Sequence, residues 1–231
     1  MDESTLKTTL IALAAGIILL VFVYTSWQSR SRLAQVQAFP SVLQAAGLHL
    51  ITNPTLHESY RFLPTFYPNM GVDKTLYAAT KQEDHTHISA LVYEDKRVRS
   101  IHPVLVLIAT LSYTAPAVGI YTRSTPFGPI TPTGQRVFKT NETELDKAFK
   151  ITAVSEPDFQ SLVTPELRQF LGQNKDITHI EMAHHTLALF TSDDRFFALT
   201  TLNGIPSPEV FTRRLSQLHE LQRLLDRQFH E

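Results

Sequence analysis

Histidine is the residue type in this chain best suited to chemistry, because the 231 residues include ten histidines and no cysteine. His85 and His87 stand two positions apart, directly after Glu83 and Asp84. On a strand this spacing projects both imidazoles from one face, as a metal site requires, and the two acids can add oxygen ligands. The alternative is that "KQEDHTH" forms a polar turn that leads into a strand. His85 and His87 are therefore candidate metal ligands.

A second histidine pair, His184 and His185, follows Glu181 between two predicted strands, and Asp193 and Asp194 mark the next break. A metal or acid–base site built from these groups would need an open coordination position and supporting side chains around it. The alternative is that they are exposed turn residues, because successive turns of a meander lie at opposite ends of the sheet. The candidate metal ligands are thus His85, His87, His184 and His185.

The motifs of the common enzyme classes are missing from the sequence. It contains no P-loop, no dinucleotide-binding glycine pattern, no Gly-x-Ser-x-Gly elbow and no His-Glu-x-x-His. Tyr121, Arg123 and Ser124 form one more polar group, which we interpret as a solvated loop. We therefore predict no catalytic residue and no cofactor. The favoured function is a non-enzymatic interaction or scaffold module, and the alternative is a membrane-tethered, metal-dependent hydrolase that uses His, Asp and Glu side chains.

An apolar run near the start of the chain predicts a membrane anchor. No residue from Leu10 to Tyr24 is charged, and the flanking Thr8 and Trp27 extend the segment to about 20 residues, which is the span of a bilayer core. A signal peptide would have a basic start and a small-residue cleavage site, whereas this chain opens "MDESTLK". We therefore predict a tail over 1–7, an uncleaved single-pass transmembrane helix over 8–27 and a juxtamembrane linker over 28–39.

The charges that flank this helix predict its orientation. Arg30 and Arg32 follow the apolar run without a compensating acid, while Lys7 before it is offset by Asp2 and Glu3. The positive-inside rule then places the following module on the cytoplasmic side of the inner (plasma) membrane. The predicted partners are the lipid bilayer, through residues 8–27, and one or more proteins.

The module behind the anchor is electrically neutral. When Lys7, Asp2 and Glu3 are set aside, 20 basic and 20 acidic residues remain. Nucleic-acid-binding domains carry a basic excess. We therefore predict no nucleic-acid partner.

The first half of the module, residues 40–122, predicts a short helix followed by a sheet. "FPSVLQAAGLHLI" begins with Pro40 and Ser41 and can form a helix that Gly47 ends. The runs "KTLYAATKQ", "THISALVYED", "HPVLVLIATLS" and "AVGIYTR" have the composition of successive antiparallel strands. The segment from Val104 to Leu111 is apolar at nearly every position, so we place it centrally in the sheet with both faces covered.

The stretch 123–140 is rich in proline and glycine, which predicts a linker or a long surface loop, with partner binding as the alternative. Helices are then predicted to begin at four places. Their start signals are Asn141 with Glu144, Ser155 with Asp158, the run Thr164-Pro165-Glu166, and the run Ser207-Pro208-Glu209.

Between the third and the fourth of these helices the sequence predicts a three-stranded meander. Its strands are "ITHIEM", "TLALFTS" and "RFFALTTL", separated by turns at "AHH" and "SDD". The last helix has a single apolar stripe that should dock on the meander, and its members are Phe211, Leu215, Leu218, Leu221, Leu225 and Phe229. The expected fold is α+β, with antiparallel sheet and packed helices, either as one domain or as sub-domains 40–122 and 141–231.

The order of these segments is similar to that in a class of bacterial one-pass membrane proteins of unknown function. The similarity covers residues 40–200 and rests on "LQAAGLHL", "HPVLVLIATLSYTAPAVGIYTR" and "DKAFKITAVSEPDFQSLVTPELRQFLGQ". The resemblance implies a membrane-tethered α+β domain. It brings no catalytic residues.

Overall fold

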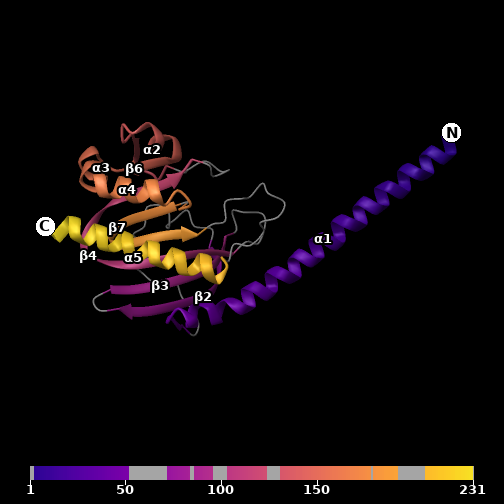
Figure 1. Ribbon diagram of the computed structural model, residues 1–231, viewed down its shortest axis with the longest axis horizontal. Coiled ribbons are helices and arrows are strands. Elements are labelled where there is room, and N and C mark those ends of the chain that lie inside the picture. Colours follow the sequence, from indigo (N-terminus) through magenta and orange to yellow (C-terminus); the bar gives the residue numbers. More distant parts are fainter. Residues whose placement is uncertain are drawn as a thin grey trace. The chain divides into compact units, whose positions relative to one another are not determined.

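The computed structural model of the chain describes residues 3–51, 72–83, 86–95, 103–123, 131–177, 179–191 and 206–230. The chain divides into two compact units, Met1–Phe39 and Pro40–Glu231. The second unit contains all of the strands (Figure 1).

The first unit is formed by helix α1 (Glu3–Ala45), which continues into the start of the second unit. The predicted linker 28–39 is helical too, because the sequence has no glycine or proline between Gly16 and Pro40 that would interrupt the helix. The chain leaves the helix at Gly47, as predicted. Gly47 adopts a φ of 80°, and the Leu48 N–H donates to the Leu43 carbonyl at 3.0 Å.

No helix in the described part of the chain is both long enough and apolar enough to cross a membrane. The transmembrane helix over 8–27 therefore remains a prediction.

The second unit is built on one antiparallel sheet of seven strands, which confirms the α+β fold with packed helices. The path of hydrogen-bonded neighbours is β1-β2-β3-β4-β6-β5, and β7 pairs with β4 beside this path. The strands are β1 (His49–Leu50), β2 (Val72–Glu83), β3 (Thr86–Asp95), β4 (Pro103–Thr122), β5 (Arg136–Phe138), β6 (Phe149–Ala153) and β7 (His179–Thr191).

Strand β7 doubles back on itself at the predicted "AHH" turn. A straight strand would separate His179 from Phe190 by about 36 Å, at roughly 3.3 Å per residue. Their ring centroids instead lie 4.1 Å apart. His184, at a φ of 53°, is the non-glycine residue in this strand with left-handed backbone, and it marks the reversal. The turn is therefore where the sequence predicts it, and the predicted third strand, "RFFALTTL", lies outside the described residues.

Strand β4 makes the same reversal, because it stays paired with β7 along both arms (Figure 1). Its register with β7 shifts between Thr110 and Ala115 and again between Ala115 and Val118. The two strands predicted at 102–112 and 117–123 are thus the two arms of β4. The first arm lies between β3 and β7, and Leu105 to Ala109 are buried, which confirms the predicted central position.

The two sequence halves share this sheet. One edge of β4 pairs with β3 along its first arm and with β6 along its second arm, so β4 joins strands from both halves. The predicted boundary at 123–140 therefore does not separate two units. It contributes the edge strand β5, which pairs with β6.

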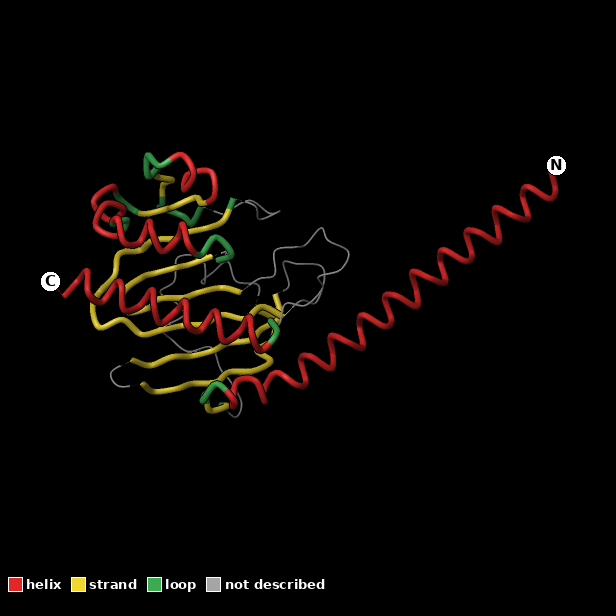
Figure 2. The backbone as a smooth tube through the Cα atoms, in the orientation of Figure 1, coloured by secondary structure: helices red, strands yellow, loops and turns green. Residues whose placement is uncertain are grey.

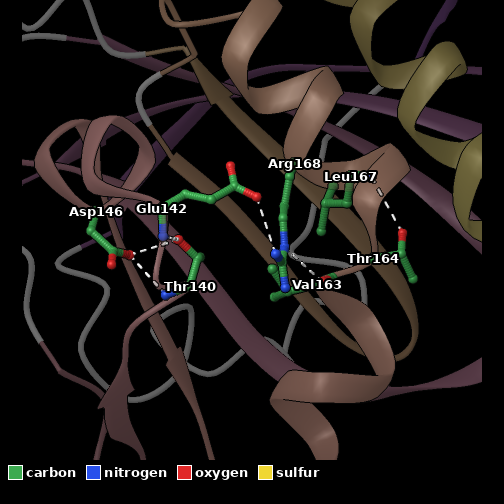
Figure 3. Close-up of polar contacts among 7 residues, drawn as sticks. All are labelled: Thr140, Glu142, Asp146, Val163, Thr164, Leu167 and Arg168. Carbon is green, nitrogen blue, oxygen red and sulfur yellow. Dashed lines mark hydrogen bonds and ion pairs between the residues drawn. The ribbon is translucent and has the colours of Figure 1, made fainter.

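Two of the three short helices begin at the capping residue that the sequence predicts. The helices are α2 (Thr143–Ala148), α3 (Glu156–Leu162) and α4 (Pro165–Gln173), and α2 is the exception. The Ser155 and Thr164 side chains accept hydrogen bonds from the N–H groups of Asp158 and Leu167, which confirms both predicted caps. The cap predicted at Asn141 is wrong, because Asn141 is left-handed, with a φ of 64°. The neighbouring Thr140 instead binds the Asp146 carboxylate through its N–H and its hydroxyl, at 2.8 and 2.9 Å (Figure 3).

Helix α5 (Pro208–His230) lies across β4 and β7 (Figure 2). Its predicted stripe faces inward, and Leu218, Leu221 and Leu225 are fully buried, each contributing about 1.5–3 kcal/mol. Arg214 and Gln217 bind Asp176 in the turn after α4, with the Arg214 Nη1 to Asp176 Oδ2 distance at 3.0 Å. These contacts fix α5 relative to α4.

Candidate functional site

Of the four histidines predicted as metal ligands, the three that the structure describes are not gathered into one centre. His87 on β3 lies with Nδ1 3.4 Å from the Ser89 hydroxyl, and His185 lies with Nε2 3.4 Å from the Thr114 hydroxyl. His184 is exposed at the reversal of β7, and His85 lies outside the described residues. Within the described ranges, no three His, Cys, Asp or Glu side chains are placed to hold a metal ion. The metal site therefore remains a prediction.

The sheet instead brings together Tyr121 from the second arm of β4 and His179 and Glu181 from the first arm of β7. In the strand register Tyr121 lies opposite His179, and Gly119 lies opposite Glu181. Positions two apart on a strand share a face, and so do directly opposed residues, so all four residues lie on one face. We call Tyr121, His179 and Glu181 the buried trio.

A carboxylate is the centre of the buried trio. Glu181 has 0% exposure, and its Oε1 lies 3.2 Å from the Tyr121 hydroxyl, which donates to it, and 2.6 Å from His179 Nε2. A buried carboxylate is costly unless it has hydrogen-bond donors, and these two contacts help to stabilise Glu181 in the interior. The trio therefore ties β4 to β7 through a polar contact.

Two aromatic rings pack against the imidazole of His179. The Tyr121 ring centroid lies 4.4 Å from that of His179, and the Phe190 ring stacks on His179 at 4.1 Å with an interplanar angle of 11°. Phe190 comes from the other arm of β7, so the reversal of this strand builds the stack. The His179 side chain retains 20% exposure. The imidazole is thus held in one orientation while one part of it reaches the surface.

Gly119 makes room for this arrangement. A Cβ at this position would lie 2.6 Å from Cζ of Tyr121, far inside the contact distance of two carbons. The Tyr121 ring therefore lies across the backbone of Gly119, and this position lets its hydroxyl reach Glu181. A glycine at 119 is required by this close approach.

Polar side chains continue from the buried trio onto β6. Thr152 lies opposite Gly119, and its hydroxyl contacts the Gln135 side-chain oxygen at 2.6 Å. Lys150 lies opposite Tyr121, and its Nζ donates to the Thr131 hydroxyl at 2.7 Å. Partial burial, together with the positive charge of Arg123, lowers the pKa of Lys150.

Chemically, the buried trio is an imidazole oriented by a carboxylate. The same pairing orients histidine in general acid–base sites, where the carboxylate also fixes the tautomer. In this chain Glu181 is fully buried and His179 is 20% exposed. The arrangement fits a structural role, in which these hydrogen bonds hold β4 and β7 together. Its ring contacts and its hydrogen bond to Glu181 fix the orientation of the His179 imidazole.

The buried trio was not predicted from the sequence, and Tyr121 corrects the loop interpretation. Tyr121 is 5% exposed and lies within β4, because the strand continues to Thr122 before the proline-rich segment begins. A signal for the site was available, since His179 and Glu181 show the same two-residue spacing that singles out His85 and His87. What the sequence does not show is that the reversal of β7 returns Phe190 to this point.

No family model matches the sequence, and no curated protein matches it. Among solved structures, the fold is similar to the crystal structure of the mycobacterial trehalose monomycolate transport factor A, TtfA, with a TM-score of 0.59. The match covers 83% of this chain and 94% of that chain, at 6% sequence identity. At this level of identity the similarity shows the fold alone.

Proposed function

We propose that this protein is a membrane-anchored, non-enzymatic interaction module that serves as an accessory subunit of a membrane complex. The observation that carries the proposal is the surface of α1. The large side chains from Ile17 to Val23 are each more than half exposed, and Leu13 before them is 62% exposed. Seven consecutive positions cover every side of a helix, so this surface is apolar all round and lacks the polar side of an ordinary surface helix.

A helix that is apolar on every side needs an apolar environment. In the sequence the apolar character continues from Thr8 to Trp27, about 20 residues, which matches the thickness of a bilayer core. Tyr24 and Trp27 then suit the membrane interface, and Arg30 and Arg32 suit the cytoplasmic side. The proposed location of the module is the cytoplasmic face of the inner membrane.

The fold supports an accessory role for the module. The solved structure with a similar fold is described as a transport factor, and the similarity covers 83% of this chain and 94% of that chain. We propose a role of the same kind, in a transport or assembly process at a membrane, with the substrate left open. The similarity to one-pass membrane proteins of unknown function, proposed from the segment order, agrees with this role.

Alkaline extraction of membranes from cells that express the full chain tests the anchor. We expect the chain to stay in the membrane pellet, and a variant with Ile18→Arg and Val21→Arg to move to the soluble fraction, because each arginine at a helix centre costs about 2.5–3.5 kcal/mol of insertion. The matched control is Ala34→Arg with Gln37→Arg, two exposed positions of the same helix beyond the apolar run. Release of the unmodified chain at alkaline pH would contradict the proposal.

A further inference from the structure

We draw no further inference here: the strongest candidate, the exposed aliphatic patch of Val137 and Val154 at the β5–β6 edge of the sheet, carries nothing because nothing in the structure shows what covers it.

Discussion

Two tyrosines of this chain are expected to respond in opposite ways to loss of their hydroxyl. Tyr121 donates to the buried carboxylate of Glu181, whereas the Tyr113 hydroxyl is buried and has no hydrogen-bond partner among the residues that the structure describes. Tyr121→Phe should lower the free energy of unfolding by about 1–3 kcal/mol, because a buried acceptor loses a hydrogen-bond donor. Urea denaturation followed by circular dichroism measures this loss, and an unchanged midpoint would show that Glu181 does not depend on Tyr121.

Tyr113→Phe is the matched substitution. It removes an unsatisfied hydroxyl and retains the ring, which stacks on Phe229 at 4.3 Å. The free energy of unfolding should stay constant or rise by up to about 1 kcal/mol. A loss comparable to that of Tyr121→Phe would mean that the Tyr113 hydroxyl has a stabilising partner.

Tyr113 also predicts a dependence of stability on alkaline pH. Burial, aided by the Asp226 carboxylate, raises the pKa of the Tyr113 phenol well above its usual range. Below the unfolded pKa of about 10 both states keep the proton, and as pH rises past it only the unfolded state loses the proton readily, so stability falls. Thermal unfolding between pH 9 and 11 should show a smaller fall for Tyr113→Phe than for the unmodified chain. Equal falls would contradict this origin.

Glycine-to-alanine substitutions test the close packing behind the buried trio. Gly119→Ala would place a methyl group against the Tyr121 ring and should cost about 1–3 kcal/mol. Gly172→Ala in α4 has no atom within 4 Å of the new Cβ and should stabilise the helix by about 0.5–1 kcal/mol. Chemical denaturation of the two variants gives both values. The packing account fails if Gly119→Ala is as well tolerated as Gly172→Ala.

At the scale of elements, the starts of the short helices depend on single side chains. The Thr164 hydroxyl accepts from the Leu167 N–H at 3.4 Å and lies 3.5 Å from the Gln228 side chain of α5 (Figure 3 shows the first contact). Thr164→Ala should therefore cost about 0.5–2 kcal/mol. Thr143→Ala, at the exposed first position of α2, should change stability by less than about 0.5 kcal/mol. Thermal unfolding measures the loss of stability in both variants. Equal losses would show that the Thr164 side chain does not stabilise the start of α4.

Elements whose signals are local could be predicted from the sequence. β3 lies at the predicted residues, and the starts of α3, α4 and α5 follow from Ser155, Thr164 and the Ser-Pro-Glu run at 207–209. Each signal acts over three or four residues, where side-chain chemistry decides the backbone. The exception at Asn141 has the same local origin, since the left-handed conformation that asparagine tolerates displaces it from the cap.

Contacts between distant segments could not be predicted in this way. The turn at 183–185 is visible in the sequence, but nothing in the sequence shows that β4 reverses beside it and keeps both arms paired. The paired reversal of β4 and β7 places Phe190 next to His179. It also buries Tyr121, which is expected from the sequence to lie in a loop, at a position where it donates a hydrogen bond. The candidate site was missed for that reason, because its members lie about 60 residues apart in the sequence.

At the scale of the whole molecule, the chain joins an apolar helical surface to a compact α+β unit. Within the second unit, β4 pairs with strands from both sequence halves, so the module should unfold as one cooperative body. A module that folds as one unit on the proposed anchor suits a protein that presents one fixed surface to a partner. We therefore expect the protein to bind a protein partner at the membrane.

Isolation of the tagged full chain from its native membranes in mild detergent, with mass spectrometry and metal analysis of the same sample, tests that expectation most directly. We predict a stoichiometric protein partner that co-purifies with the unmodified chain and is lost with Ile18→Arg and Val21→Arg, which should remove the chain from the membrane. A lone chain that carries a stoichiometric metal ion would contradict the account and favour a metal-dependent hydrolase built on the histidines.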